Sequence, residues 1–175
     1  DDATINRSGG SLTAEPLFEA LVNIQYTGSG AITTGFELPT GTVTTNVTVD
    51  NDDQGVTLNA NHTINNLTLT NGDFNFSGRV LTMTGDLTGA GNLLADVDAQ
   101  LILNGTNAFT IPSSIATIGN LNINRDNGVS IGGDLLVEQV LKLTQDFTVG
   151  AHRLTLKNAI QGDDSKLNAD NSSSI

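Results

Sequence analysis

Short alternating segments that recur at intervals of about 20 residues are the feature of this sequence that most constrains its fold. Val47, Leu67, Leu101, Leu121 and Leu141 each begin a run of alternating apolar and polar residues, and three of the four intervals between them are equal. Alternation with a period of two is typical of a β-strand with one buried face. Turn pairs such as Asn-Gly, Gly-Asp and Gly-Gly separate the runs. Short strands at a constant spacing predict an all-β chain folded as a parallel β-helix, or β-solenoid, of roughly 20-residue coils.

A longer internal repeat overlies this rhythm. The segment from Asn46 aligns with the segment from Asn120 at a nearly constant offset, with one-residue adjustments. The alignment places Gly55 on Gly128 and also pairs Asp73 with Asp146, Phe74 with Phe147, Leu81 with Leu154 and Gly89 with Gly162. The matched residues are turn and core types, so the repeat is structural.

The repeat defines the organisation of the chain. Residues 1–175 form a single repeat array, in which 1–45 are a partial repeat with entry coils, 46–119 are copy one and 120–175 are an incomplete copy two. The last residues correspond to the interior of copy one, which predicts that the array belongs to a longer protein.

The alternative fold is a series of β-sandwich repeats, because the chain length and strand spacing also suit that architecture. The strands are short for a sandwich, and the chain has no Trp to form its buried centre. The two folds differ in their core. The solenoid predicts one continuous core that contains Leu69, Leu103, Ile123 and Leu143.

Charge excludes several classes of partner. The formal net charge is −12, from seven Lys and Arg against 19 Asp and Glu. Nucleic acid requires a basic surface, and an anionic membrane would repel this chain, so neither is a predicted partner. No apolar run approaches the roughly 18 residues that span a bilayer, which argues against membrane insertion. The absence of Cys removes disulfides and thiolate metal sites.

One segment partly matches a calcium-binding loop. Asp50, Asp52 and Asp53 belong to the sequence DNDDQG, which places oxygen ligands at its first, third and fifth positions and Gly55 at its sixth. The twelfth position is Asn61 instead of Glu, and the alternative interpretation is a solvated turn. Calcium is the one cofactor that the sequence suggests.

The residues available for catalysis are few, and no catalytic residue is predicted. His62 and His152 do not correspond between the copies, and neither belongs to a nucleophile–base arrangement. The carboxylate pairs Asp96/Asp98 and Asp163/Asp164 leave glycoside hydrolysis open, which makes a carbohydrate-active β-helix domain the alternative function. A single Tyr and six Phe offer little aromatic surface for a sugar. We therefore expect the chain not to be an enzyme.

Threonine pairs suggest a further alternative. Thr-x-Thr occurs at Thr42/Thr44, at Thr68/Thr70 and at Thr82/Thr84. A flat stack of such pairs would suit an ice-binding β-solenoid, but Thr is also a favourable outward residue on any strand. Lysines interrupt the corresponding positions of the second copy.

The segment 26–39 reads YTGSGAITTGFELP, and the phrases NVTV, GVTL and NLTLTNG follow from Asn46, Gly55 and Asn66. This style of repeat resembles long repetitive surface proteins, or adhesins, of the Bacteroidetes, and the resemblance covers most of the chain from about residue 20. In the second copy, TIPSSI from Thr110 replaces the end of the first phrase, so that phrase need not be a binding motif. The resemblance implies export, often by the type IX secretion route.

The combined prediction is a structural or adhesive segment of a large exported protein, located outside the cell or at its surface. It would act as a stiff stalk or display scaffold. Its expected partners are the neighbouring repeats of the same polypeptide, together with surface glycans or other surface proteins.

Overall fold

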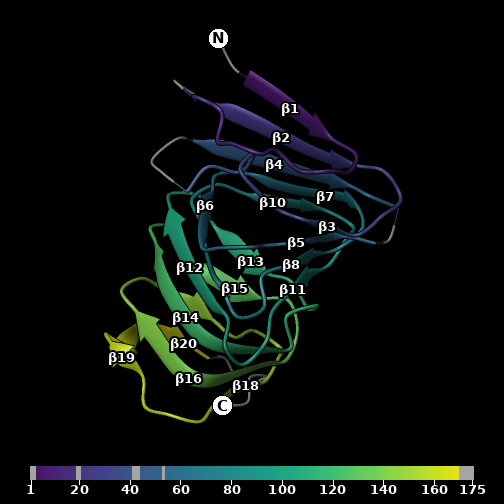
Figure 1. Cartoon of the computed structure of the whole chain (residues 1–175). Helices are drawn as coiled ribbons and strands as arrows, with labels where there is room; N and C mark the ends of the chain where they lie inside the picture. Colours follow the sequence, from purple (N-terminus) through teal and green to yellow (C-terminus); the bar gives the residue numbers. More distant parts are fainter. Residues whose placement is uncertain (1–2, 19–20, 41–43, 53, 170–175) are drawn as a thin grey trace.

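A computed structural model describes residues 3–18, 21–40, 44–52 and 54–169 of the chain. Within these ranges the chain forms about eight turns of a parallel β-solenoid with coils of roughly 20 residues (Figure 1). A 3-10 turn, η1 (Asp164–Lys166), lies near the end of the described part.

The strands form four sheets, A to D. Sheet A contains β1 (Ala3–Arg7), β2 (Val22–Thr27), β4 (Thr45–Asp50), β7 (Leu67–Asn71) and β10 (Leu87–Gly89). Sheet B contains β3 (Ile32–Thr33), β5 (Val56–Thr57), β8 (Phe74–Asn75) and β11 (Leu93–Leu94).

Sheets C and D hold the remaining strands. Sheet C contains β6 (His62–Ile64), β9 (Val80–Met83), β12 (Gln100–Gly105), β14 (Thr117–Arg125), β16 (Leu135–Leu143), β18 (Leu154–Leu156) and β19 (Gln161–Gly162). Sheet D contains β13 (Phe109–Ile111), β15 (Val129–Ile131), β17 (Phe147–Thr148) and β20 (Leu167–Asn168).

The pairing register shows that each coil lies directly on the previous one. Leu81 pairs with Leu101, Leu101 with Leu121, and Leu121 with Leu141, all in parallel strands and at equal intervals along the chain. A β-sandwich is built from antiparallel strands, so the sandwich alternative is wrong. The predicted solenoid and its coil length are confirmed.

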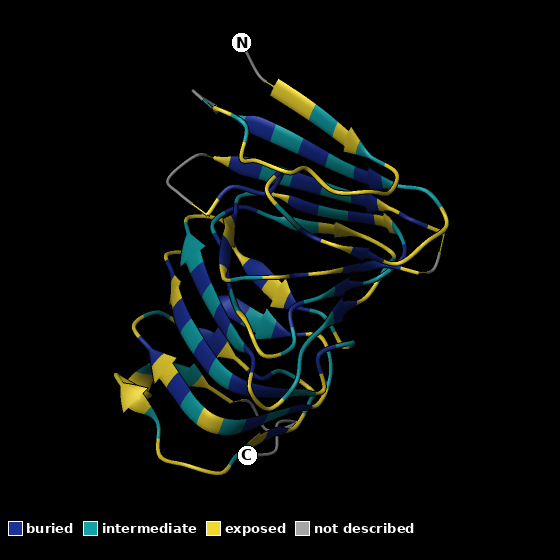
Figure 2. Cartoon of the chain, in the orientation of Figure 1, coloured by how far each residue is buried: buried dark blue, intermediate teal, exposed yellow. Residues whose placement is uncertain are grey.

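Columns of apolar residues inside the coils form the core. Ile64, Met83, Leu103, Ile123 and Leu143 are in register along sheet C, and each is 0% exposed. Buried and less buried residues alternate along the strands, so that every second side chain points into the core (Figure 2). The predicted core residues lie in one cluster that extends from the coils of sheet A to those of sheet D. The alternation of period two therefore located the core correctly.

The cross-section of the solenoid changes midway along it. Sheets A and B end at β10 and β11, sheet D begins at β13, and sheet C continues through both halves (Figure 1). At the change, β14 and β16 lengthen to nine residues each, and their register shifts between Ile118 and Asn120. Gly119, which lies between Ile118 and Asn120 in β14, has no room for a side chain, because a Cβ atom there would lie 2.2 Å from the carbonyl oxygen of Val97.

The two sequence copies share their turns but not their sheets. Gly55 and Gly128 both have positive φ, at 69° and 75°. Beside them, Val56 N–H donates to the Asp73 carbonyl at 2.7 Å, and the equivalent bond from Val129 to Asp146 is 2.9 Å. Yet β5 and β8 lie in sheet B, whereas their counterparts β15 and β17 lie in sheet D. The offset between the copies is not a whole number of coils, so equivalent residues do not stack.

Candidate functional site

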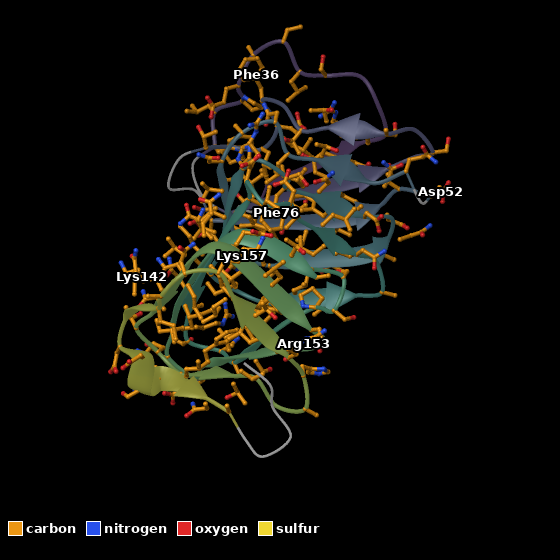
Figure 3. All side chains as sticks on the ribbon, turned by 90° about the horizontal axis from the view of Figure 1, so that it is seen from below. Phe36, Asp52, Phe76, Lys142, Arg153 and Lys157 are labelled. Atoms are coloured by element: carbon orange, nitrogen blue, oxygen red, sulfur yellow. The ribbon has the colours of Figure 1, made fainter. Side chains whose placement is uncertain are left out.

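The candidate calcium loop begins at the end of β4. Asp50 is the last residue of that strand, Asp52 is exposed with φ 24°, and Asp53 lies outside the described residues. Figure 3 shows Asp52 at the edge of the molecule, far from Phe36. Between the aspartates, Asn51 is 0% exposed, and its Nδ2 donates to the Gly30 carbonyl at 2.9 Å and to the Gly55 carbonyl at 3.0 Å. Its side chain therefore closes the turn and ties it to the previous coil.

Metal binding at this loop stays a prediction. Within the described ranges, no three His, Cys, Asp or Glu side chains are grouped closely enough to hold a metal ion. The carboxylate of Asp52 accepts a 3.4 Å hydrogen bond from Asn71 of the next coil, as a solvated turn residue would.

In each candidate carboxylate pair one member, Asp96 or Asp163, holds a turn. Asp96 Oδ1 accepts hydrogen bonds from the backbone N–H of Gly78 at 2.9 Å and of Asp98 at 3.1 Å. Asp163 caps η1, where its Oδ1 accepts from Ser165 N–H at 3.1 Å and Ser165 Oγ at 2.6 Å. The hydrogen bond from Ser165 lowers the pKa of the Asp163 carboxyl. Both carboxylates have a local structural role that requires no substrate.

The fold keeps the two histidines apart. His62 begins β6, which lies at one end of sheet C, and His152 precedes β18 at the other end. Four strands lie between β6 and β18 in the sheet. These histidines therefore do not form a joint acid–base pair.

The threonine pairs are distributed over more than one sheet. Thr68 and Thr70 belong to β7 in sheet A, Thr82 belongs to β9 in sheet C, and Thr42 lies outside the described residues. Along sheet C, the column that begins with Thr63 and Thr82 continues with Ile102, Asn122 and Lys142. This column is therefore not a continuous threonine array, and ice binding stays a prediction that the geometry does not favour.

A cluster of hydrogen-bonded polar side chains lies at a corner of the first coils, around Glu37. The Glu37 side chain is fully buried, and its Oε1 accepts hydrogen bonds from Arg7 Nη1, from Tyr26 Oη at 3.0 Å and from Gly35 N–H at 2.9 Å. Arg7 also donates from Nη1 to the Thr33 carbonyl at 2.8 Å. We call Arg7, Tyr26 and Glu37 the corner cluster. It joins β1, β2 and the loop after β3.

Sequence reasoning missed the corner cluster, although two signals pointed to it. Glu37 lies between apolar residues in the phrase FELP, which is an unusual place for a carboxylate that faces solvent. Arg7 ends the triplet INR, and the same triplet ends at Arg125. Both arginines are the last residue of a strand, and both reach carbonyl oxygens of other segments.

A pocket of about 350 Å³ opens beside the corner cluster. Phe36, which Figure 3 shows at the edge of the molecule, is 50% exposed there, and His62 forms another part of the lining. The remaining lining residues are Ser11, Leu12, Glu15, Gly35, Leu38, Thr40 and Asn59. His62 is held in place by contacts of 3.3 Å from Nδ1 to the Pro39 carbonyl and from Nε2 to Asn59 Oδ1. The pocket is thus lined by both apolar and polar side chains.

Glu37 and His62, which both lie at this corner, have pKa values that are lowered from their ordinary values. Burial would raise the pKa of the Glu37 carboxyl, but its hydrogen bonds with backbone N–H groups, Arg7 and Tyr26 outweigh burial and lower it. Burial also lowers the pKa of His62, although the Pro39 carbonyl and the charge of Glu37 oppose that shift. Burial and the neighbouring Glu37 raise the pKa of Tyr26, so Tyr26 keeps its proton and donates it.

The corner should make the fold sensitive to acid. The folded state binds fewer protons than the unfolded state at both Glu37 and His62, so its stability falls as pH falls. The loss from His62 begins near its unfolded pKa of 6.5, and the loss from Glu37 begins near 4.5. We expect the Tm measured by circular dichroism to fall in these two stages.

Variants separate the two stages. His62→Gln should remove the upper stage, and Glu37→Gln should reduce the lower stage. His152→Gln is the matched control and should keep the wild-type profile. A Tm that rises on acidification through this range would contradict the prediction.

Sheet D carries a second surface feature, a column of outward polar side chains. Thr110, Ser130, Thr148 and Asn168 are in register on four successive coils, and the hydroxyl oxygens of Thr110 and Ser130 lie 3.0 Å apart. A shallow groove of about 270 Å³ follows this column. Neighbouring coils are about 4.8 Å apart, so the column offers hydrogen-bonding groups at a regular spacing.

No family model matches the chain, and no curated protein and no solved structure is significantly similar to it. Among the described residues, no helix is long and apolar enough to cross a membrane. The class that the structure defines is therefore the parallel β-solenoid.

Proposed function

We propose that this chain is a structural segment of a large exported surface protein, in which the stacked coils act as a stiff stalk or display scaffold outside the cell. The observation that carries the proposal is the role of the buried polar groups. Asn51 and Arg125 both use their side chains to bond backbone carbonyls of other coils. These buried polar side chains thus hold the rod together.

The repetitive style of the sequence and its polar outer faces support the same proposal. The outward positions carry mainly Thr, Asn, Ser and Gln, for example in the column on sheet D. Such faces suit contact with surface glycans or with other surface proteins, because hydroxyl and amide groups both donate and accept hydrogen bonds. Catalysis is no part of the proposal, since the candidate carboxylates Asp96 and Asp163 are engaged in turns.

A scaffold should tolerate the loss of a whole coil. Deletion of residues 47–66 joins Asn46 to Leu67 and brings β2 onto β7, because Ile24 pairs with Val47 and Val47 with Leu67. The same deletion brings β3 onto β8. We expect this variant to fold cooperatively, and the rod to shorten by about 5 Å.

Deletion of residues 47–56 is the matched control. It removes only part of a coil, shifts the register and should abolish folding. Circular dichroism and denaturant titration measure both variants. Failure of the whole-coil variant to fold would oppose the scaffold, and release of reducing sugar from polysaccharides by the intact chain would show an enzyme instead.

A further inference from the structure

Side-chain hydrogen bonds between coils mostly join residues one coil apart. Asn124 to Asn104, Thr144 to Asn124 and Asn46 to Asn23 are examples, with separations of 20 to 23 residues. In a stack held by such bonds, each coil is coupled to its immediate neighbours, and the stack can open coil by coil.

Arg125 departs from this pattern. It ends β14 on the inward face, and its side chain is 0% exposed. Its Nη1 donates to the Asn104 carbonyl at 2.8 Å, and its Nε donates to the Asn107 carbonyl, both in the preceding coil. Its Nη2 reaches one coil further, to the Gly85 carbonyl at 2.7 Å, across 40 residues. One guanidinium therefore bonds backbone atoms of two coils besides its own.

Two neighbours complete this arrangement. The Asp86 carboxylate lies 3.4 Å from Arg125 Nη2, and it also accepts hydrogen bonds from Asn107 Nδ2 at 3.2 Å. The guanidinium carbon lies 5.1 Å from the centre of the Phe109 ring, within the range of a cation–π contact. The planar guanidinium with five N–H donors suits this site, whereas the single ammonium of lysine could not reach all of these carbonyls.

Arg125 and its hydrogen-bond partners lie where the cross-section of the solenoid changes. Gly85 and Asp86 precede β10, the last strand of sheet A, and Phe109 begins β13, the first strand of sheet D. At this change sheets A and B give way to sheet D, so their ladders of backbone hydrogen bonds end, while the ladder of sheet C continues. In the same region, Gln139 Nε2 donates at 3.0 Å to the Val97 carbonyl, across 42 residues. Side-chain bonds that span two coils thus occur near the place where sheets A and B end.

We propose that Arg125 is a mechanical clamp that makes residues 85–125 unfold as one block when the rod is pulled. This inference rests on the proposed stalk function, because a clamp has a role only in a rod that is under tension. A stack coupled only through bonds between nearest neighbours would lose one coil at a time. The bond from Arg125 back to Gly85 closes a segment of about two coil lengths, and this segment opens as a unit because no part of it can leave until all bonds of the guanidinium are broken.

Single-molecule pulling on the whole chain through its two ends tests the clamp. An unfolded residue extends by at most about 3.6 Å, so one coil releases roughly 70 Å of chain and the block on the order of 140 Å. We expect the wild type to show the larger step. Arg125→Met keeps the length and the apolar stem but removes the donors, and we expect the larger step to divide into single-coil steps.

Arg153→Met is the matched control, because Arg153 is exposed and pairs at 3.2 Å with Asp134, one coil away. It should leave the larger step intact. Single-coil steps in the wild type, or an undivided large step in Arg125→Met, would overturn the clamp. These outcomes leave the stalk proposal standing, since that proposal is tested by coil deletion.

Hydrogen exchange on the wild type provides a test that does not require a variant to fold. The clamp predicts one common opening free energy for the amides of β12 and of residues 120–125 in β14. Distinct opening free energies for these two strands would overturn it.

Discussion

Replacement of Leu103 by aspartate is expected to abolish cooperative folding of the coils around it. Leu103 is 0% exposed, and in sheet C it pairs with Met83 on one side and Ile123 on the other. The substitution removes a buried apolar side chain and places a carboxylate within an apolar column. Burial of an unpaired charge costs at least several kcal/mol, which is comparable to the whole stability of a typical domain, about 5–15 kcal/mol.

Thr63→Asp is the control for Leu103→Asp. Thr63 lies on the outward side of β6 in the same sheet, and the substitution changes the net charge by the same amount. A surface substitution of this kind should alter the free energy of unfolding by about 0.5 kcal/mol or less. Urea denaturation of the two variants distinguishes the faces. Similar losses of stability in both would contradict the assignment of inner and outer faces.

Gly105→Ala is the second substitution with a large expected effect. Gly105 has φ +107°, and a Cβ atom there would lie 2.2 Å from the carbonyl oxygen of Thr84 in the preceding coil. The variant therefore adds backbone strain of about 1–2 kcal/mol to a steric conflict between two coils that costs roughly 1–3 kcal/mol. Because that conflict is with backbone, it can be relieved only by separation of the coils. We expect a fall in Tm of roughly 6 °C or more for a chain of this size.

Gly78→Ala separates the backbone strain from the steric conflict between coils. Gly78 also has positive φ, at 68°, but a Cβ atom there would meet nothing within 4 Å. It should show the backbone strain alone, and its Tm should fall by clearly less than that of Gly105→Ala. Differential scanning calorimetry measures both variants. Equal falls would mean that the close approach between coils has no energetic weight.

Local patterns in the sequence were enough to predict the secondary structure, the coil length and the core. Alternation of period two placed Leu69, Leu103, Ile123 and Leu143 inside, and all four are buried. The match of Gly55 with Gly128 correctly indicated a shared turn geometry. These features depend on residues close together in the chain, or on a spacing that every coil repeats, so periodicity reveals them.

The polar clusters were not predictable in the same way. Arg7 and Glu37 are 30 residues apart, and Arg125 and Gly85 are 40 residues apart. The sequence does contain one indication, because Arg125 follows Leu121 and Ile123 at inward positions of its strand. An inward arginine requires acceptors, but their identity depends on which coils lie above it and in what register.

The placement of the repeats on the sheets was likewise decided by the tertiary structure. The two copies match in sequence, yet β5 lies in sheet B and its counterpart β15 in sheet D. Sequence similarity conserves the local turn, whereas stacking is determined by backbone hydrogen bonds between successive coils. The repeat and the coil have different lengths, so equivalent residues of the two copies fall on different sheets. The alternating strands and their core face follow from the sequence alone. The sheet that each strand joins, and the carbonyls that each buried arginine meets, follow only from the stacked fold.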